Sequence, residues 1–275
     1  MFSVEEYPKG RLDLKENFQT GKGLCSFVGI FKSVSLLTTL GIMLHHMVIH
    51  PAPLSFYPAY LTSWGMFFSI CYLSGSFLLT TRHSSAVITP DANNRLIKFT
   101  WVLFSLSSVW ECVIAVLYWS LRPAKMGPIL LENVTTHGVI VPILLVQGLL
   151  VDHIPSRLKH CSVAVLFGIL YLSWLAIQNV AIRYNPLDNG DDDAIYDGFR
   201  WRNEPIQTLK YSLIIVFAIV PAFAVLIWAL SLRGRRYLDK PGEEEESSVV
   251  EEFDEEIEGS NWCAVDDDID EADES

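Results

Sequence analysis

The sequence predicts an all-α polytopic membrane protein, a bundle of six transmembrane helices followed by a disordered acidic tail. Three observations support this fold class. Apolar runs recur between residues 24 and 232, and most approach the roughly 20 helical residues needed to cross about 30 Å of hydrocarbon. Short loops rich in Lys and Arg alternate along the chain with loops that contain few of them, as in membrane proteins. Residues 241–275 contain 17 acidic side chains and no basic one.

Six spans are expected, and the fourth is the shortest. Their approximate ranges are 24–48, 60–79, 99–121, 136–151, 162–182 and 209–232. This divides the chain into a cytoplasmic N-terminal segment (1–23), a six-helix transmembrane domain (24–232) and a cytoplasmic tail (233–275) that is acidic and disordered from residue 241. The first twenty residues mix charges of both signs and lack an apolar core, so we expect no cleavable signal peptide.

The orientation in the membrane is predicted from the basic residues, because Lys and Arg are retained on the cytoplasmic side. The amino terminus, the second and fourth loops and the stretch after the last span together hold 13 basic residues, whereas loops one, three and five hold five. Both termini should therefore be cytoplasmic, in either the plasma membrane or the endoplasmic reticulum. The net charge of −12 belongs to the tail, since residues 1–240 hold 20 basic against 15 acidic side chains.

The acidic segments and the cysteines limit the ligands to be expected. The tail cannot bury enough apolar surface to fold, so we expect it to be available to a cytoplasmic partner. The run DNGDDD at 188–193 lacks the ligand order of an EF-hand, and we interpret it as a solvated loop rather than a calcium site. The five cysteines form no CxxC pair, which predicts free thiols. We expect no metal, no organic cofactor and no nucleic-acid partner.

Lys32 and Glu111 are charged residues that lie well inside predicted spans. Lys32 lies in the first span, and we expect its aliphatic stem to extend toward the inner membrane surface. Glu111 lies midway through the third span, where an acidic group usually faces the bundle interior or a cavity. The sequence leaves open whether Glu111 is structural, functional or simply protonated.

Two further residues suggest chemistry. In the stretch 132–147, a mainly polar run of six residues precedes a mainly apolar run of ten, and His137 stands at the border. Thr62 is near the start of the second span as His137 is near the start of the fourth, so at about 1.5 Å per helical residue they should lie at similar depths on one predicted outer face. A threonine hydroxyl becomes nucleophilic when a neighbouring base takes its proton, and imidazole can do so near neutral pH. Ser63 and Asn133 are candidate supporting or oxyanion donors.

Other interpretations of these residues stay open. A threonine near the start of a helix often caps it, and a histidine at the membrane interface often only forms hydrogen bonds there. His45, His46 and His50, at the end of the first span, offer competing imidazoles and, together with His137, a metal site. No carboxylate that would orient His137 is evident.

Three short motifs give the chain a family resemblance. They are YLTSWG at 60–65, ENVTTHGVIVPILL at 132–145 with IPSR at 154–157, and RYNPLD at 183–188. With the span count and spacing, they resemble the rolling-stone and androgen-induced membrane protein family, and the Leu-Thr-x-Trp form of the first motif is most similar to the rolling-stone branch. The acidic run after RYNPLD departs from the family pattern. The resemblance therefore does not extend to the route of substrate entry, whereas the chemistry that it implies is unaffected.

The resemblance implies a function, because this six-span family includes hydrolases of fatty acid esters of hydroxy fatty acids. Thr62 matches the family's proposed threonine nucleophile and His137 its proposed histidine. We therefore expect an integral membrane lipid ester hydrolase whose acyl-ester substrate enters from the membrane lipids. Rolling-stone relatives are associated with myoblast fusion, so a non-enzymatic membrane adaptor or cell-fusion protein is the alternative. A transporter using Glu111 and Lys32 is a third hypothesis, but no pair of Gly- or Pro-broken spans signals an internal repeat.

Overall fold

The computed structural model describes residues 27–49, 53–83, 90–121, 131–182, 185, 194–196 and 198–238, which are predominantly helical and contain no β-strand. Within these residues, six helices or runs of helical segments are long and apolar enough to cross a membrane. The predicted all-helical class and the number of candidate spans are therefore confirmed. The chain divides into two units, Met1–Arg235 and Arg236–Ser275, and the bundle below belongs to the first.

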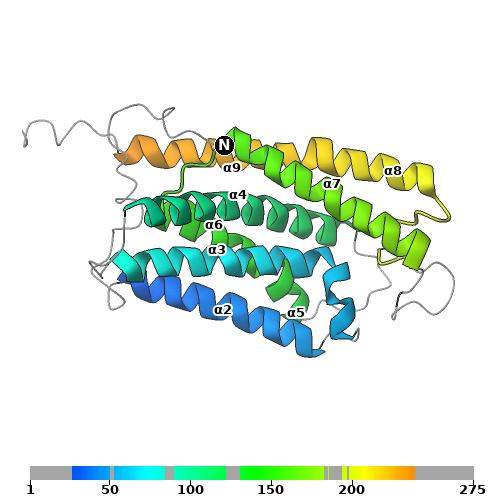
Figure 1. Cartoon of the computed structure of the whole chain (residues 1–275), viewed down its shortest axis with the longest axis horizontal. Coiled ribbons are helices and arrows are strands. Elements are labelled where there is room, and N and C mark those ends of the chain that lie inside the picture. Colours follow the sequence, from blue (N-terminus) through cyan, green and yellow to red (C-terminus); the bar gives the residue numbers. More distant parts are fainter. Residues whose placement is uncertain are drawn as a thin grey trace, which may run out of the picture. The chain divides into compact units, whose positions relative to one another are not determined.

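Each candidate span is one helix or several helical segments joined end to end (Figure 1). A short 3₁₀ helix, η1 (Leu54–Ala59), lies between the first two spans in the chain. In chain order the spans are α2 (Phe27–Ile49); α3 (Leu61–His83); α4 (Pro90–Leu121); α5 (Leu131–Val134) with η3 (Thr135–Val139), α6 (Ile140–Leu145) and η4 (Val146–Val151); η5 (Leu158–His160) with α7 (Cys161–Ile177) and η6 (Gln178–Ile182); and α8 (Pro205–Ile214) with η7 (Ile215–Ile219) and α9 (Val220–Leu238).

The expected start of the fourth span was wrong. This span begins at Leu131 rather than near Thr136, so the polar residues ENVTT form its first turns. These residues lower the local hydropathy, so a prediction from apolar runs places the start of the helix too late. Their backbone groups nevertheless form hydrogen bonds within the helix. As a result, His137 lies about two helical turns inside the span rather than at its border.

The core of the bundle is built around α4, which packs against α3, α6 and α7. In its most apolar stretch 78% of the residues are buried, compared with 22% in α2. Phe104, Trp110 and Val113 of α4 are among the buried core residues. A polar residue on α4 therefore faces other helices, whereas a residue on the outer side of α2 does not.

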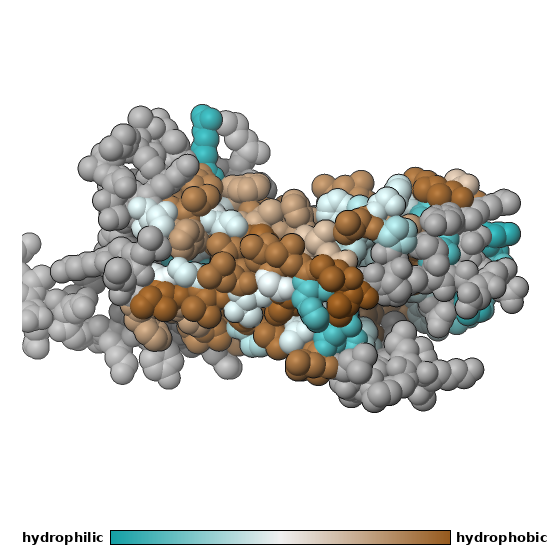
Figure 2. All heavy atoms as spheres, turned by 90° about the horizontal axis from the view of Figure 1, so that it is seen from below, coloured by the Kyte–Doolittle hydropathy of each residue, from teal (hydrophilic) through white to brown (hydrophobic). Residues whose placement is uncertain are grey.

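The outer side of α2 carries a hydrophobic stripe. Its exposed members recur every three or four residues, the spacing of one helix face, and are Phe27, Ile30, Val34, Leu37, Leu40, Leu44 and Val48. Figure 2, which looks at the bundle from the side on which α2 lies in Figure 1, shows a largely hydrophobic surface there. An exposed apolar stripe on a helix of this length is what contact with lipid requires.

Two of the helix runs contain a π-helical turn just before a proline. The turn η3 precedes Pro142, and η7 precedes Pro221. A proline has no N–H group, so the carbonyl four residues earlier, that of Gly138 or Phe217, loses its α-helical donor. We attribute the wider turns to this loss, and the first of them carries His137.

Gly148 marks the closest approach of the fourth span to α4, because a Cβ at this position would lie 2.0 Å from the Phe104 ring. We expect Gly148→Ala to lower the free energy of unfolding by about 1–3 kcal/mol, as overpacking of a core does. Gly41 has nothing within 4 Å of the corresponding position, so Gly41→Ala should be neutral or slightly stabilising. Thermal unfolding of both variants in one detergent measures the difference, and equal midpoints would contradict the tight packing.

Candidate active site

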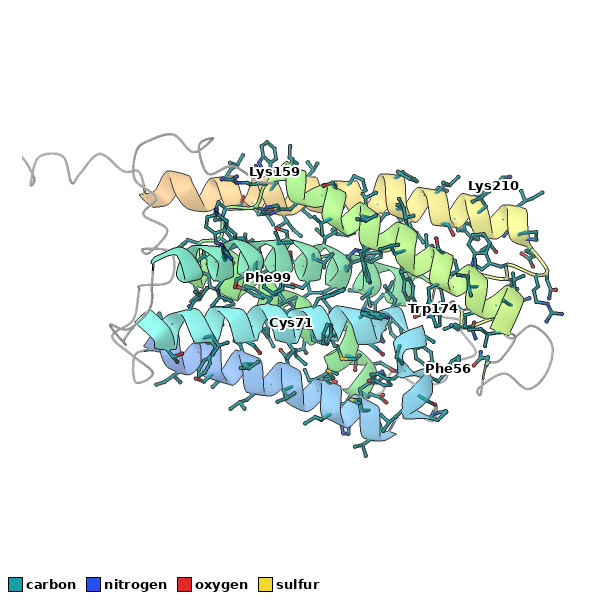
Figure 3. The ribbon with its side chains drawn as sticks, viewed as in Figure 1. Phe56, Cys71, Phe99, Lys159, Trp174 and Lys210 are labelled. Atoms are coloured by element: carbon teal, nitrogen blue, oxygen red, sulfur yellow. The ribbon has the colours of Figure 1, made fainter. Side chains whose placement is uncertain are left out.

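The candidate residues gather at the end of the bundle where α2 ends and α3 begins, which we call the η1 end. Figure 3 shows Phe56 of η1 at this end, with Lys159 toward the opposite one. Thr62 is the second residue of α3 and is half-buried. His137 is in the π-helical turn η3 and is also half-buried.

The depth of Thr62 along the bundle axis can be compared with that of residues on α4, because α3 and α4 run antiparallel and one hydrogen bond fixes their alignment. Midway along both helices, Ser69 Oγ donates a hydrogen bond of 3.2 Å to Glu111 Oε1. Seven residues, about two turns or 10.5 Å, lead along α3 from Ser69 to Thr62 and along α4 from Glu111 to Tyr118. Both steps go toward the η1 end, so Thr62 and Tyr118 lie at the same level.

His137 is in direct contact with α4 at that level. Its ring stacks on the Tyr118 ring with centroids 3.8 Å apart and planes inclined by 16°. The neighbouring Trp119 Nε1 donates a hydrogen bond of 3.3 Å to the His137 carbonyl. His137 is therefore held at the level of Thr62, which is consistent with the similar depths expected from the sequence.

Two polar atoms of η3 are buried without a hydrogen-bond partner. They are Thr136 Oγ1 and His137 Nδ1. An unsatisfied buried polar atom costs about 1–3 kcal/mol, and such atoms are few in native proteins. A polar group of a bound ligand would satisfy both. The imidazole of His137 can therefore accept a hydrogen bond from a bound group or donate one to it.

Thr62 and His137 do not contact each other through a direct hydrogen bond, since none joins them among the described residues and His137 Nδ1 has no partner at all. The direct form of the predicted contact is absent. Contact through one water or through a substrate between them stays a prediction. A substrate carbonyl placed between a nucleophile and a base is compatible with a longer separation in the free protein.

The expected supporting residues have different environments. Ser63 is buried, and its hydroxyl oxygen has no hydrogen-bond partner within the described part of the chain. Burial raises the pKa of Tyr57 in η1 to about 12, the nearby Ser63 side chain lowers this pKa, and the Glu132 carboxylate raises it. Tyr57 is therefore a neutral hydrogen-bond donor at physiological pH. Asn133 is half-buried in α5 and stays a candidate donor.

A carboxylate does reach the η1 end, but it contacts a different histidine. His46 Nδ1 lies 3.1 Å from Glu132 Oε1, and their side chains are 10% and 25% exposed. Sequence reasoning missed this pair because 86 residues separate its members. The alternative metal site finds no support, since the described residues contain no group of three or more His, Cys, Asp or Glu that could hold a metal ion. His50 lies outside those residues.

The fifth loop also contributes to the η1 end. The backbone N–H of Leu61 donates a hydrogen bond of 2.8 Å to the Tyr196 hydroxyl, which satisfies one of the free amides at the start of α3. Burial raises the pKa of Tyr196, so its hydroxyl stays neutral. A residue from this loop is thus placed next to Thr62. The acidic run at 188–193 lies outside the described residues.

Glu111 faces the bundle interior, as expected for an acidic residue at that depth. Its side chain is 1% exposed and accepts the hydrogen bond from Ser69. A Cβ on Gly65 would lie 2.7 Å from Glu111 Oε1, so the glycine leaves the space that the carboxyl group fills. Glu111 is about two turns from the level of Thr62, too far for direct contact with a group reacting there.

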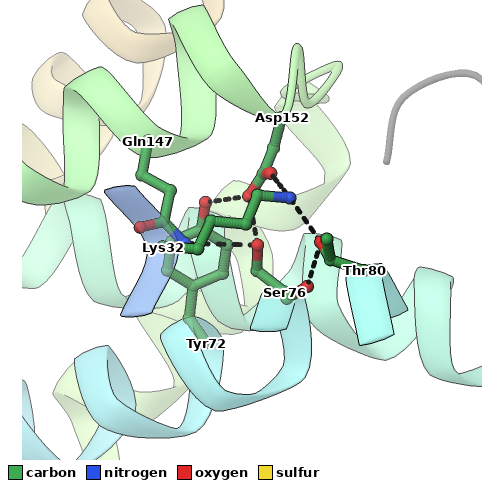
Figure 4. A network of polar contacts seen from close by, with 6 residues as sticks. All are labelled: Lys32, Tyr72, Ser76, Thr80, Gln147 and Asp152. Atoms are coloured by element: carbon green, nitrogen blue, oxygen red, sulfur yellow. Dashed lines mark hydrogen bonds and ion pairs between the residues drawn. The ribbon is translucent and has the colours of Figure 1, made fainter. Parts of the chain in front are cut away.

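The expectation for Lys32 was wrong in that its ammonium group is buried in an ion pair rather than exposed at the membrane surface. Lys32 is fully buried, and its Nζ lies 2.6 Å from Asp152 Oδ1 and donates to Thr80 Oγ1 over 2.8 Å. The hydroxyls of Tyr72 and Ser76 each donate a hydrogen bond of 2.7 Å to Asp152 Oδ2 (Figure 4). The ion pair and these hydroxyls connect α2 and α3 to Asp152, which directly follows η4. This network lies away from the η1 end.

One sequence signal could have found this network. Tyr72, Ser76 and Thr80 recur every four residues, which places three hydroxyls on one face of α3. A polar stripe inside a candidate membrane helix indicates a polar partner on a neighbouring helix. Gln147 of η4 supplies a further contact, since its Nε2 donates to Ser76 Oγ over 3.2 Å.

Comparisons with known proteins found no matching protein-family model, no similar curated protein and no similar solved structure. The resemblance to the rolling-stone family stays a prediction that rests on the three motifs. The IPSR motif follows η4, and its Ile154 N–H donates to the Gly148 carbonyl over 2.8 Å. Most of RYNPLD lies outside the described residues, as do the N-terminal segment at 1–23 and the acidic tail.

The cysteines within the described part of the chain are free thiols, as predicted. They are Cys71, Cys112 and Cys161, in α3, α4 and α7. Cys25 and Cys263 are not among the described residues.

Proposed function

We propose that the protein is an integral membrane lipid ester hydrolase in which Thr62 is the nucleophile and His137 the general base. The observation that supports this most is the buried Nδ1 of His137, which has no hydrogen-bond partner and lies at the level of Thr62. A core histidine retained only for packing would be expected to have its ring nitrogens satisfied. The π-helical turn that carries His137 agrees with this proposal, since such turns are frequent at functional sites.

The reaction proceeds in two steps. Thr62 Oγ bonds to the ester carbonyl carbon while its proton passes to His137, and the ester C–O bond then breaks as His137 returns the proton to the leaving alkoxide. This releases a hydroxy fatty acid and leaves an acyl group on Thr62. Water hydrolyses that acyl-enzyme and releases the second fatty acid. Ser63, Asn133 and the neutral Tyr57 are the candidate donors to the oxyanion.

The substrate class follows from the surroundings of the site. Apolar side chains line the outside of the bundle along its length, so an acyl chain can approach through the membrane rather than from water. Fatty acid esters of hydroxy fatty acids place an ester bond within such chains. No metal or organic cofactor takes part in the proposed steps.

The direct test is an assay of the purified protein against a panel of branched and unbranched lipid esters. Both products, the fatty acid and the hydroxy fatty acid, are quantified by mass spectrometry. We expect hydrolysis of the branched esters above the level of a Thr62→Ala preparation. If well-folded protein hydrolyses none of the panel, the adaptor or cell-fusion hypothesis replaces this one, with the acidic tail as the segment that binds a cytoplasmic partner.

The orientation of the chain determines which side of the membrane the proposed site faces. If both termini are cytoplasmic, the η1 end with Thr62 faces outward, because α2 crosses the membrane once before it. In sealed right-side-out vesicles, a protease added outside should leave the tail at 241–275 intact, and it should cut the tail after permeabilisation. Cleavage of the tail from outside would reverse the orientation and place the η1 end in the cytoplasm.

A further inference from the structure

The pair His46–Glu132 lies at the candidate site but has no role in the reaction as described so far. His46 belongs to the last turn of α2, and Glu132 to the first turn of α5. The pair therefore joins the first span to the span that carries His137. His46 is 8% exposed, so the contact is not a surface ion pair of little consequence.

His46 lies beside the elements that lead to both proposed catalytic residues. Its ring centroid lies 5.5 Å from that of Tyr57 in η1, the short helix that precedes the start of α3 and Thr62. On the other side, α2 packs against η3, the turn that carries His137. The site thus contains two histidines. His137 stacks on Tyr118 and has no carboxylate partner among the described residues, whereas His46 contacts the Glu132 carboxylate.

We propose that His46, oriented by Glu132, is a second catalytic imidazole that activates the water molecule which releases the acyl group from Thr62. This inference rests on the proposed ester hydrolysis and assigns its second step. His137 serves the attack by Thr62, and His46 serves the attack by water. Glu132 is a positioning residue, because it acts on the substrate only through His46.

The chemistry fits the geometry of the pair. Nδ1 of His46 contacts Glu132, and the proposal assigns the proton transfer with water to Nε2. A carboxylate on Nδ1 fixes the ring and stabilises the imidazolium that forms when the base takes a proton. The water oxygen bonds to the acyl carbon and gives its proton to His46, the bond from that carbon to Thr62 Oγ breaks, and the proton passes to Thr62 Oγ. The fatty acid leaves and Thr62 is restored.

The experiment separates the two steps by rapid mixing of full-length purified protein with a p-nitrophenyl ester of a long-chain fatty acid. The burst of p-nitrophenol reports acylation, the steady rate reports deacylation, and mass spectrometry of quenched protein locates the acyl group. For His46→Gln and Glu132→Gln we expect the burst to persist, the steady rate to fall about 10²-fold, as loss of a general base does, and acyl-Thr62 to accumulate.

Three further measurements sharpen the test. Glu132→Asp should recover part of the steady rate, because it keeps the carboxylate. Added imidazole should accelerate deacylation of His46→Ala. His45→Gln is the matched control, since His45 is the adjacent residue but is exposed, and it should behave as the wild type.

Two results would overturn the role of His46 while leaving the hydrolase intact. One is a wild-type steady rate in both His46→Gln and Glu132→Gln. The other is an equal loss of burst and steady rate in folded variants, which would assign the pair to acylation or to structure. By contrast, absence of acyl-Thr62 in the wild type and in every variant would refute the proposed function itself, and this inference with it.

Discussion

Thr62→Ala should reduce ester hydrolysis to the background rate, and His137→Ala should lower kcat by about 10²–10⁴-fold, the usual contribution of a general base. The threonine variant has no group that can form the acyl-enzyme. The histidine variant keeps the hydroxyl but has nothing to take its proton. Because the two residues act as one unit, the double variant should be little slower than either single variant.

These rates are meaningful only for folded protein, so the thermal midpoint of each variant is measured in the same detergent. Thr81→Ala is a suitable control, because Thr81 lies on the same helix as Thr62 but near its other end and bonds only to the Leu78 carbonyl. It should keep full activity. Near-normal turnover by Thr62→Ala would exclude this residue as the nucleophile.

Lys32→Met should be the most destabilising single substitution in the bundle, lowering the free energy of unfolding by about 3–5 kcal/mol. The change leaves the Asp152 carboxylate fully buried with hydroxyl donors but no cation. Asp152→Asn should be similarly harmful, because it leaves the Lys32 ammonium buried beside Thr80 without an anion. Denaturation of purified protein, followed by circular dichroism, measures both effects.

The double variant Lys32→Met/Asp152→Met tests the cause of this loss. Replacing both partners of a buried ion pair by apolar residues often restores stability, so the double variant should be clearly more stable than either single one. Lys210→Met is the control, because Lys210 is exposed midway along α8, and it should change stability by less than about 0.5 kcal/mol. A Lys32→Met protein as stable as this control would show that the ion pair contributes nothing to the bundle.

The sequence predicted the number and approximate positions of the spans because a membrane-crossing helix needs a long apolar run, a local property of the chain. It misplaced the start of the fourth span, where polar residues such as Asn133 and Thr135 form the first turns. Hydropathy alone does not distinguish a polar helical turn from a loop. The burial of Glu111 was also expected, since its depth follows from its place in the span.

The contacts between spans were not predictable in the same way. Lys32 was expected near the membrane surface because its partner, Asp152, follows a different span. His46 and Glu132 were likewise not connected in the sequence, and their contact depends on how α2 packs beside α5. The similar depth of Thr62 and His137 was predicted from span direction, but the stacking on Tyr118 that holds His137 in place was not.

The most direct measurement for the central proposal is the mapping of a covalent adduct. The purified protein is treated with a lipid-like fluorophosphonate of the kind that labels serine hydrolases, digested and sequenced by mass spectrometry. We predict a single adduct on Thr62 that is absent from Thr62→Ala and strongly reduced in His137→Ala. An adduct on Ser63, or turnover of lipid esters by protein that acquires no adduct at Thr62, would contradict the proposed nucleophile.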